Sequence, residues 1–412
     1  MYPRPFYVLY AAVFVATLGI SMVSPLLPVY AKQLGATGLW IGLTFSIFAL
    51  TQTIFGPFSG RLSDRFGRKP FIVAGLTLYM VAALGYLTAN SFVQVMAFRA
   101  LSGVGTSLIF SVARAYIGDM VPRGYEGRWF GFFATADIIG FGTGPLIAGI
   151  LRQAIGFDSV FIAMALLMAS SAAIVFVLLP VRAPRIRVRT EHGVEEEEPQ
   201  IPGVGLWQAL HHRLVLALTL TTGFTSLSFG ATFSFLAVRL ENDLGVAPAL
   251  VGVAFGVENL SSGIAQPIMG RVVDAGDRRL IVAVGIFLSS TLLASLGLAS
   301  HLWLVIVLLL FAGVGQAISW VSTSALQVVA GRRVGMGSVL GLGSAGNGIG
   351  ILFGSVAGGV IVDLFSISAT FFFAGAVMLA GLPIFLVLTR GVSTREQEVP
   401  VLEPAVVVPS PR

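Results

Sequence analysis

The sequence is dominated by long apolar runs, each about as long as an α-helix that crosses a lipid bilayer. One crossing takes about 20 residues, and an open strand would leave its backbone groups unpaired in lipid. Hydrophobic residues make up 56% of the chain and charged residues 11%, whereas soluble domains are about 25% charged. We predict an all-α integral membrane protein with twelve spans, near 6–30, 39–59, 71–89, 91–113, 128–150, 159–180, 212–238, 249–269, 280–299, 302–329, 335–362 and 368–389.

Several classes of chemistry have no candidate residues in this sequence. The chain has no cysteine, which excludes disulfides, thiolate metal sites and a catalytic thiol, and its histidines show no metal-ligand spacing. No G-x-x-x-x-G-K-[ST] loop is present, so ATP is not expected to be the energy source. We therefore expect neither an enzyme nor a cofactor. The stretch MYPRPF leads directly into the first run, which predicts an uncleaved first span.

The basic residues lie mostly on one side of the predicted spans. With the N-terminus inside, twenty of the 25 Lys and Arg residues fall in cytoplasmic segments, and only Lys32, Arg152 and Arg239 fall in outer loops. The positive-inside rule then predicts a multi-pass protein of the cell (inner or plasma) membrane with both termini in the cytoplasm. The pI near 10.0 follows from this distribution and does not indicate nucleic-acid binding.

The chain is divided into two related halves. The polar stretch 182–205 is predicted to be a flexible cytoplasmic linker between six-span halves at 1–181 and 206–390, and 391–412 a disordered cytoplasmic tail. At one ungapped offset of 210 residues, GPFSGRLSDRFGRKP (56–70) aligns with QPIMGRVVDAGDRRL (266–280) and LSGVG (101–105) with FAGVG (311–315). GFGTGPLIAG (140–149) aligns with GILFGSVAGG (350–359). Transporters often build movement around a central site from such repeats.

These segments also resemble a known family. GRLSDRFGRKP (60–70) is similar to the loop between spans 2 and 3 of the major facilitator superfamily, and FRALSGVG (98–105) resembles its span 4 motif. GFGTGPLIAG resembles the span 5 motif of its proton-coupled drug antiporters, with Ala148 where glycine is usual, and PLLP (25–28) is similar to the same subfamily. The resemblance covers almost the whole chain and implies the twelve-helix fold in two pseudo-symmetric halves.

The resemblance implies two conformational elements. The first is a latch on the inner face, in which Asp64 reaches the N-terminal end of span 11 in the outward-facing state and Arg68 pairs with Asp119. Its residues are Gly60, which is expected to permit a tight turn, Asp64, Arg65, Gly67, Arg68 and Asp119. The second is a bend in span 5 made by Gly140, Gly144, Pro145 and Gly149. The simpler alternatives are a solvated basic loop and ordinary small-residue packing.

Three charged residues are predicted near the midplane. Arg99, Asp137 and Glu258 lie about 12–14 Å deep at 1.5 Å per helical residue, where a charge costs at least about 2.5–3.5 kcal/mol. The 210 offset aligns them with Leu309, Asn347 and Phe48, so the fold does not require a charge there. Burial favours the protonated form of a carboxyl group, and we expect these residues to couple transport to protons. A structural Asp137–Arg99 ion pair is the alternative.

The predicted function is secondary transport. We expect proton-coupled efflux of small hydrophobic or amphipathic compounds, including cations, by alternating access in a monomer within the lipid bilayer, driven by the proton gradient. The alternatives are a proton-linked transporter of one metabolite such as a sugar, or a non-transporting membrane sensor. The candidate substrate-binding residues are Gln52, Phe224, Phe229, Phe233, Asn259, Gln266, Gln316, Trp320 and Asn347.

Overall fold

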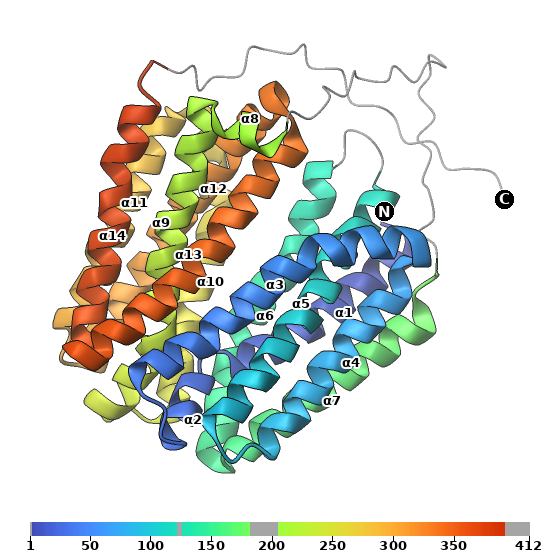
Figure 1. Ribbon diagram of the computed structural model, residues 1–412, viewed down its shortest axis with the longest axis vertical. Coiled ribbons are helices and arrows are strands. Elements are labelled where there is room, and N and C mark those ends of the chain that lie inside the picture. Colours follow the sequence, from blue (N-terminus) through green and yellow to red (C-terminus); the bar gives the residue numbers. More distant parts are fainter. Residues whose placement is uncertain (1, 122–125, 182–204, 392–412) are drawn as a thin grey trace.

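The structure is a computed structural model that describes residues 2–121, 126–181 and 205–391 (Figure 1). The first half contains α1 (Arg4–Val23), α2 (Leu27–Gln33), α3 (Gly38–Phe66), α4 (Arg68–Leu87), α5 (Phe92–Met120), α6 (Glu126–Ala154) and α7 (Phe157–Leu178). The second contains α8 (Leu206–Leu210), α9 (Arg213–Val238), the π-helical turn η1 (Arg239–Asp243), α10 (Pro248–Ala275), α11 (Arg278–Ser295), the 3₁₀ turn η2 (Leu296–Leu298), α12 (Leu302–Val334), α13 (Met336–Leu364) and α14 (Ile367–Leu388).

Within the described residues, eleven helical segments are long and apolar enough to cross a membrane. One of them joins α1 and α2 across the turn at Pro25, and another joins α9 and η1. The twelfth predicted span is α10, which is 28 residues long. Its apolar run is interrupted at the centre by Glu258, Asn259, Ser261 and Ser262. The least hydrophobic span therefore carries a candidate charged residue.

The helices form two bundles, α1–α7 and α9–α14, that lie side by side (Figure 1). Each bundle has an apolar core of its own, around Tyr79 and Met164 in the first and around Leu218 and Phe385 in the second. The extensive contacts between the bundles are those of α3 with α13 and of α6 with α10. Because the 210 offset relates α3 to α10 and α6 to α13, these contacts are equivalent in the repeat.

The α3–α13 contact begins at one end of the molecule and stops near its middle. A Cβ added at Gly42 would collide with the Ser355 carbonyl, and midway along the helices Thr53 lies against Gly348. Two turns further, at Gly60, no described atom lies within 4 Å of an added Cβ. The bundles diverge toward the end that carries α8 (Figure 1). We name this end the open face and the opposite end, where α3 begins and α13 ends, the closed face.

The α6–α10 contact follows the same course. Near the closed face, the Pro145 carbonyl lies against Gly252, and midway along the helices Ile138 lies against Gly263. Gly131 and Gly270 continue these two helix faces toward the open face, and no described atom lies within 4 Å of a Cβ added at either. The halves are thus in contact from the closed face to mid-helix and separate beyond that level.

The prediction of a loop over 60–70 is wrong in its bounds. Helix α3 continues through Gly60 to Phe66, and the turn into α4 is made by Gly67 alone, whose φ of 93° favours glycine. A Cβ at Gly60 would meet open space, so Gly60 makes no tight turn here. The predicted linker 182–205 and tail 391–412 lie, except for Gly205 and Gly391, outside the described residues, and the domain bounds stay predictions.

Candidate functional site

Arg99 lies at the centre of the first half, on α5, and is 1% exposed. Its guanidinium carbon is 4.1 Å from the ring centroid of Phe48 and 5.2 Å from that of Phe45, both on α3. Nη2 donates to the Ser24 hydroxyl at 3.4 Å, while Nε and Nη1 have no hydrogen-bond partner among the described residues. Aromatic faces, and not a carboxylate, therefore surround this cation.

Asp137 lies on α6 and is half-buried. Its carboxylate accepts a hydrogen bond from the Thr17 hydroxyl on α1 at 2.9 Å, and no ion pair with Arg99 occurs. The alternative of a structural Asp137–Arg99 pair is therefore wrong. The repeat contains the same connection: Asn347 on α13 accepts from the Ser226 hydroxyl on α9 at 2.6 Å. Asp137 and Asn347 thus join equivalent helices within their own halves, and the amide shows that this contact needs no charge.

Glu258 lies on α10 in the second half and is 9% exposed. Its backbone packs against Gly313 of α12, and its carbonyl accepts from the Ser261 hydroxyl at 2.9 Å. Among the described residues its carboxyl group has no hydrogen-bond or ion-pair partner in the structure. The first half has the same backbone contact between Phe48 and Gly103. Glu258 therefore occupies, in the second half, the place of the ring that contacts Arg99 in the first.

A group of phenylalanines connects the two halves at this level. Phe45 of α3 lies 5.6 Å from Phe233 of α9, measured between ring centroids. Phe233 in turn lies 5.1 Å from both Phe229 and Phe255. Phe255 precedes Glu258 by one turn of α10, and Asn259 donates to the Phe255 carbonyl at 2.8 Å. This aromatic layer runs from the surroundings of Arg99 to the helix that carries Glu258.

The other predicted substrate-binding residues are not all part of this layer. Gln52, Gln266 and Gln316 are half-buried, and Trp320 is 58% exposed. Phe224 packs against Gly381 of α14, a helix whose extensive contacts lie within the second half. The structure thus places Phe224 outside the aromatic layer, and its contact with substrate stays a prediction. Phe229 and Phe233 lie in the layer.

The span 5 motif has two sides. Gly140 and Gly144 face α1, where added Cβ atoms would collide with Thr17 and Ser21. Pro145 and Gly149 face α10, with Gly149 against Pro248. Pro145 also lacks the N–H that would bond the carbonyl one turn earlier, which favours a local bend. The motif therefore packs one face of α6 against α1 in its own half and the opposite face against α10 in the second half.

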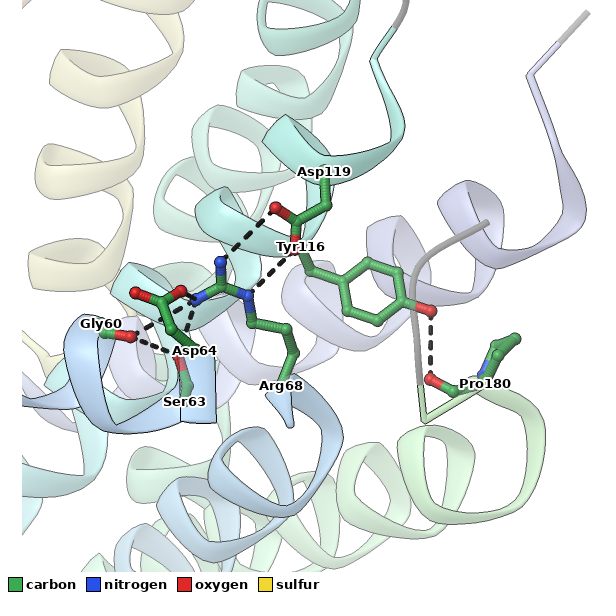
Figure 2. A network of polar contacts seen from close by, with 7 residues as sticks. All are labelled: Gly60, Ser63, Asp64, Arg68, Tyr116, Asp119 and Pro180. Atoms are coloured by element: carbon green, nitrogen blue, oxygen red, sulfur yellow. Dashed lines mark hydrogen bonds and ion pairs between the residues drawn. The ribbon is translucent and has the colours of Figure 1, made fainter. Parts of the chain in front are cut away.

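Arg68 is the centre of a polar network at the open face (Figure 2). Its guanidinium lies 2.6 Å from Asp64, 2.8 Å from the Ser63 hydroxyl and 3.1 Å from Asp119 on α5. The structure thus contains the predicted Arg68–Asp119 pair, while Arg65 is exposed. Asp64 contacts Arg68 and not α13, so its contact with span 11 stays a prediction for another state.

At the closed face the structure shows contacts between the halves that the sequence analysis missed. Arg152, predicted in a loop, lies in the last turn of α6 and forms an ion pair with Glu241 of η1; their side chains are 8% and 10% exposed. Asp363 accepts from the backbone of α3, and Gln153 from that of α10. Only the alignment of Gln153 with Asp363 at the 210 offset could have indicated the latter two. Phe45 and Phe48 were also missed as neighbours of Arg99.

Replacing Arg99 by leucine, the residue at its repeat position, is expected to leave the melting temperature unchanged or higher, because a buried charge without a carboxylate partner is removed. Arg239→Leu is the matched control. Arg239 is also buried but donates to the carbonyls of Gly297 and Ala299, so its loss is expected to cost about 2 kcal/mol or more. Thermal unfolding of both variants checks this. A large loss at Arg99 would show that its aromatic contacts outweigh the cost of burying the charge.

Comparison with known proteins agrees with this architecture. The sequence profile of the Major Facilitator Superfamily matches residues 9–238 and 218–409. The chain is 27% identical over 387 residues to the quinolone resistance protein NorA of Staphylococcus aureus, covering 93% of this chain and 96% of that protein. It is 27% identical over 368 residues to an uncharacterized MFS-type transporter of Methanocaldococcus jannaschii, covering 89% and 94%.

Solved structures show the same fold. The human organic anion transporter MFSD10 superposes with a TM-score of 0.65 at 19% identity, covering 93% of this chain and all of that one. A bacterial homolog of the human lysosomal transporter Spinster superposes with a TM-score of 0.74 at 15% identity, covering 95% and 98%. With two repeated six-span bundles and a profile match over nearly its whole length, the chain belongs to the major facilitator superfamily of secondary transporters.

Proposed function

We propose that this transporter exports small hydrophobic or cationic compounds in exchange for protons. The observation that carries the proposal is Glu258, a buried acid at the centre of α10 with no partner for its carboxyl group among the described residues. An isolated buried carboxylate is costly, and either a proton or a substrate cation removes that cost. Competition between the two at one carboxyl group would couple their movements in opposite directions.

The surroundings of Glu258 support a hydrophobic or cationic substrate. Phe233 contacts both Phe229 and Phe255, of which Phe255 lies one turn before Glu258 on α10, and aromatic faces bind both apolar groups and cations. The relative NorA is named for quinolone resistance, and its similarity extends over most of the chain. Together these features favour efflux of drug-like compounds over transport of a polar metabolite.

Asp137 and Arg99 would act with Glu258. Asp137 is half-buried and already accepts a hydrogen bond from Thr17, so we assign it the exchange of protons on the side of the first half. Arg99 would hold a positive potential across the aromatic layer from Glu258, because no acid pairs with it in this conformation. The span 5 bend at Pro145 would let α6 and α10 change their contact as the halves rock.

The proposed orientation places the open face in the cytoplasm. Exposed basic residues gather there, among them Arg61, Arg65 and Arg128, as the positive-inside rule requires. In this orientation the structure is an inward-facing state of a cell-membrane protein. The Arg68 network then lies on the cytoplasmic side and would form the contact of Asp64 with α13 when that side closes.

Replacing Arg68 is expected to slow transport while leaving the fold intact. Arg68→Ala removes the link between α3, α4 and α5. Arg68→Lys should not restore it, because Asp64 and Asp119 are contacted by different guanidinium nitrogens, and the single nitrogen of lysine does not reproduce that planar geometry. Since the side chains of Asp64 and Asp119 are 57% and 45% exposed, the loss of stability should be below about 1 kcal/mol. Initial transport rates and melting temperatures measure the two effects; full rescue by lysine would contradict the network role.

The proposed function is tested with purified protein in liposomes that contain a pH-sensitive dye. A pH gradient is imposed, and lipophilic cations are compared with neutral and anionic analogues of the same size. Cation-dependent proton movement, absent in protein-free liposomes, is expected. Proton movement with neutral compounds only would contradict the cation role of Glu258. If none of the compounds drives proton movement, a transporter of one defined metabolite or a sensor is favoured.

A further inference from the structure

The first turn of α3 is capped by the opposite half of the molecule. The Asp363 carboxylate, in the last turn of α13, accepts from the backbone N–H groups of Gly38 at 2.6 Å and Leu39 at 2.8 Å. The residue that precedes the helix, Thr37, makes no side-chain cap of its own. The first N–H groups of a helix lack intrahelical partners, and an anion at that end is favoured by the helix dipole. Asp363, in the second bundle, thus supplies the hydrogen-bond acceptor that a helix usually obtains from the residue just before it.

The same arrangement occurs a second time in the reverse direction. At the closed face, Gln153 Oε1 in the last turn of α6 accepts from the backbone N–H of Ala249, in the first turn of α10, at 3.2 Å. The residue before α10, Ala247, has no capping side chain. The 210 offset aligns Gln153 with Asp363 and Ala249 with Leu39. Each half therefore caps the second span of the other, once with a carboxylate and once with an amide.

An ion pair lies next to one of these caps and has no counterpart in the repeat. Arg152, the neighbour of Gln153, pairs with Glu241 of η1, and its Nη2 donates to Oε2 at 2.7 Å. The 210 offset aligns Arg152 with Val362 and Glu241 with Ala31. At the closed face, the α6–α10 contact therefore has the neutral cap and the ion pair next to it, whereas the α3–α13 contact has the charged cap.

We infer that Asp363 and Gln153 are positioning residues that hold the closed face shut and release it when the halves part there. In each cap the donor and the acceptor belong to different halves, so both caps must break in any state that opens this face. The freed N–H groups would then be left to water. Hydrogen bonds to a charged acceptor are about twice as strong as neutral ones, and Asp363 accepts two. Asp363 is therefore expected to hold the face more strongly than Gln153.

The inference rests on the proposed alternating-access cycle for its role in turnover, but it is tested without substrate or protons. Because the chain has no cysteine, single cysteines report directly on each face. Ser46→Cys is the reporter at the closed side: Ser46 is 4% exposed and donates to the Leu352 carbonyl between α3 and α13. Gly131→Cys is the reporter at the open side, where a Cβ meets open space. Both are labelled with a maleimide in nanodiscs, which expose both faces.

In the Ser46→Cys background, Asp363→Ala is expected to raise the labelling rate about fivefold or more, and Gln153→Ala by a smaller factor, because each shifts the population toward a state open at this face. In the Gly131→Cys background the same variants should lower the rate. Asp363→Asn, which keeps one acceptor oxygen, should fall between wild type and alanine. Asp243→Ala is the matched control: it removes an exposed carboxylate near the same face that takes no part in either cap, and no change is expected.

Two results would overturn the inference. Unchanged labelling at Ser46→Cys in the double variant Asp363→Ala/Gln153→Ala would show that the caps do not hold the face. Faster labelling at both reporters would show general loosening instead of a shift between faces. A failed proton-flux assay together with opposite shifts at the two reporters would leave the caps as determinants of conformation and reject only the proposed antiport.

Discussion

Glu258→Gln is expected to abolish substrate-driven proton movement in liposomes, lowering its rate by about 100-fold or more, as when a positioned proton-transfer group is lost. Glutamine has nearly the same shape but cannot take up or release a proton. The fold should remain, because a neutral amide at this 9% exposed position is less costly to bury than a carboxylate. We expect neutral compounds still to bind and cationic compounds to bind more weakly, which equilibrium binding to the purified variant measures.

Two further variants show whether Glu258 is the coupling acid. Asp243→Asn makes the same carboxylate-to-amide change at an exposed site and should retain wild-type flux. Asp137→Asn introduces the residue that the repeat carries at Asn347, where an amide accepts the equivalent hydrogen bond, so it should fold normally. If Asp137→Asn abolishes flux and Glu258→Gln does not, the coupling proton belongs to α6 and the assignment to Glu258 is refuted.

Much of the fold could be predicted from the sequence because lipid leaves few choices. Apolar runs of span length must be helices, and one ungapped offset showed that two halves are related. The open-face end of α3 could not be placed the same way. The apolar run of the second predicted span ends near 59, where the chain becomes polar, but the helix continues to Phe66. A helix that has already formed extends into water at little cost. Gly67, with its positive φ, ends it.

The candidate site was predicted less completely, because depth in the membrane does not determine which side chains meet. The sequence predicts similar depths for Arg99, Asp137 and Glu258, and this left an Arg99–Asp137 ion pair open as the alternative to proton coupling. The structure places Phe48 against Arg99 and Thr17 against Asp137, contacts that depend on helix rotation and on which helices are neighbours. The ion pair of Arg152 with Glu241 joins the last turn of α6 to η1, which are far apart in sequence, and no local pattern indicates it.

The offset contains information that single motifs do not. It aligns Phe48 with Glu258 and Gly103 with Gly313. In the structure Phe48 packs against Gly103 in the first half, and Glu258 packs in the same way against Gly313 in the second half. The two halves thus share one backbone design, and their differences mark where function departs from packing. Because a phenylalanine and a glutamate occupy equivalent places, the acid is not needed to form the contact. This is the strongest structural reason to assign Glu258 a role in transport.

Gly252→Ala is expected to lower transport about tenfold or more by preventing the closed face from forming, since a population shift of this size follows from about 1.4 kcal/mol. A Cβ at Gly252 would collide with the Pro145 carbonyl and lie 3.1 Å from the Leu146 Cα. Both are backbone atoms of α6, which cannot turn aside as a side chain can. In an isolated helix the change from glycine to alanine would stabilise the helix by about 1 kcal/mol. A loss of transport must therefore come from the contact between the halves.

Two alanine variants separate this contact from a general effect on helices. At Gly223 the nearest atom, the Gly346 carbonyl oxygen, is 3.8 Å from an added Cβ, and at Gly270 no described atom lies within 4 Å. Both variants should keep or raise the melting temperature, and Gly223→Ala should transport normally. Gly252→Ala should also speed maleimide labelling of Ser46→Cys. Normal transport with continued protection of Ser46→Cys would mean that α6 and α10 can separate slightly at Pro145 without opening the face, and the closed-face contact would then not control the cycle.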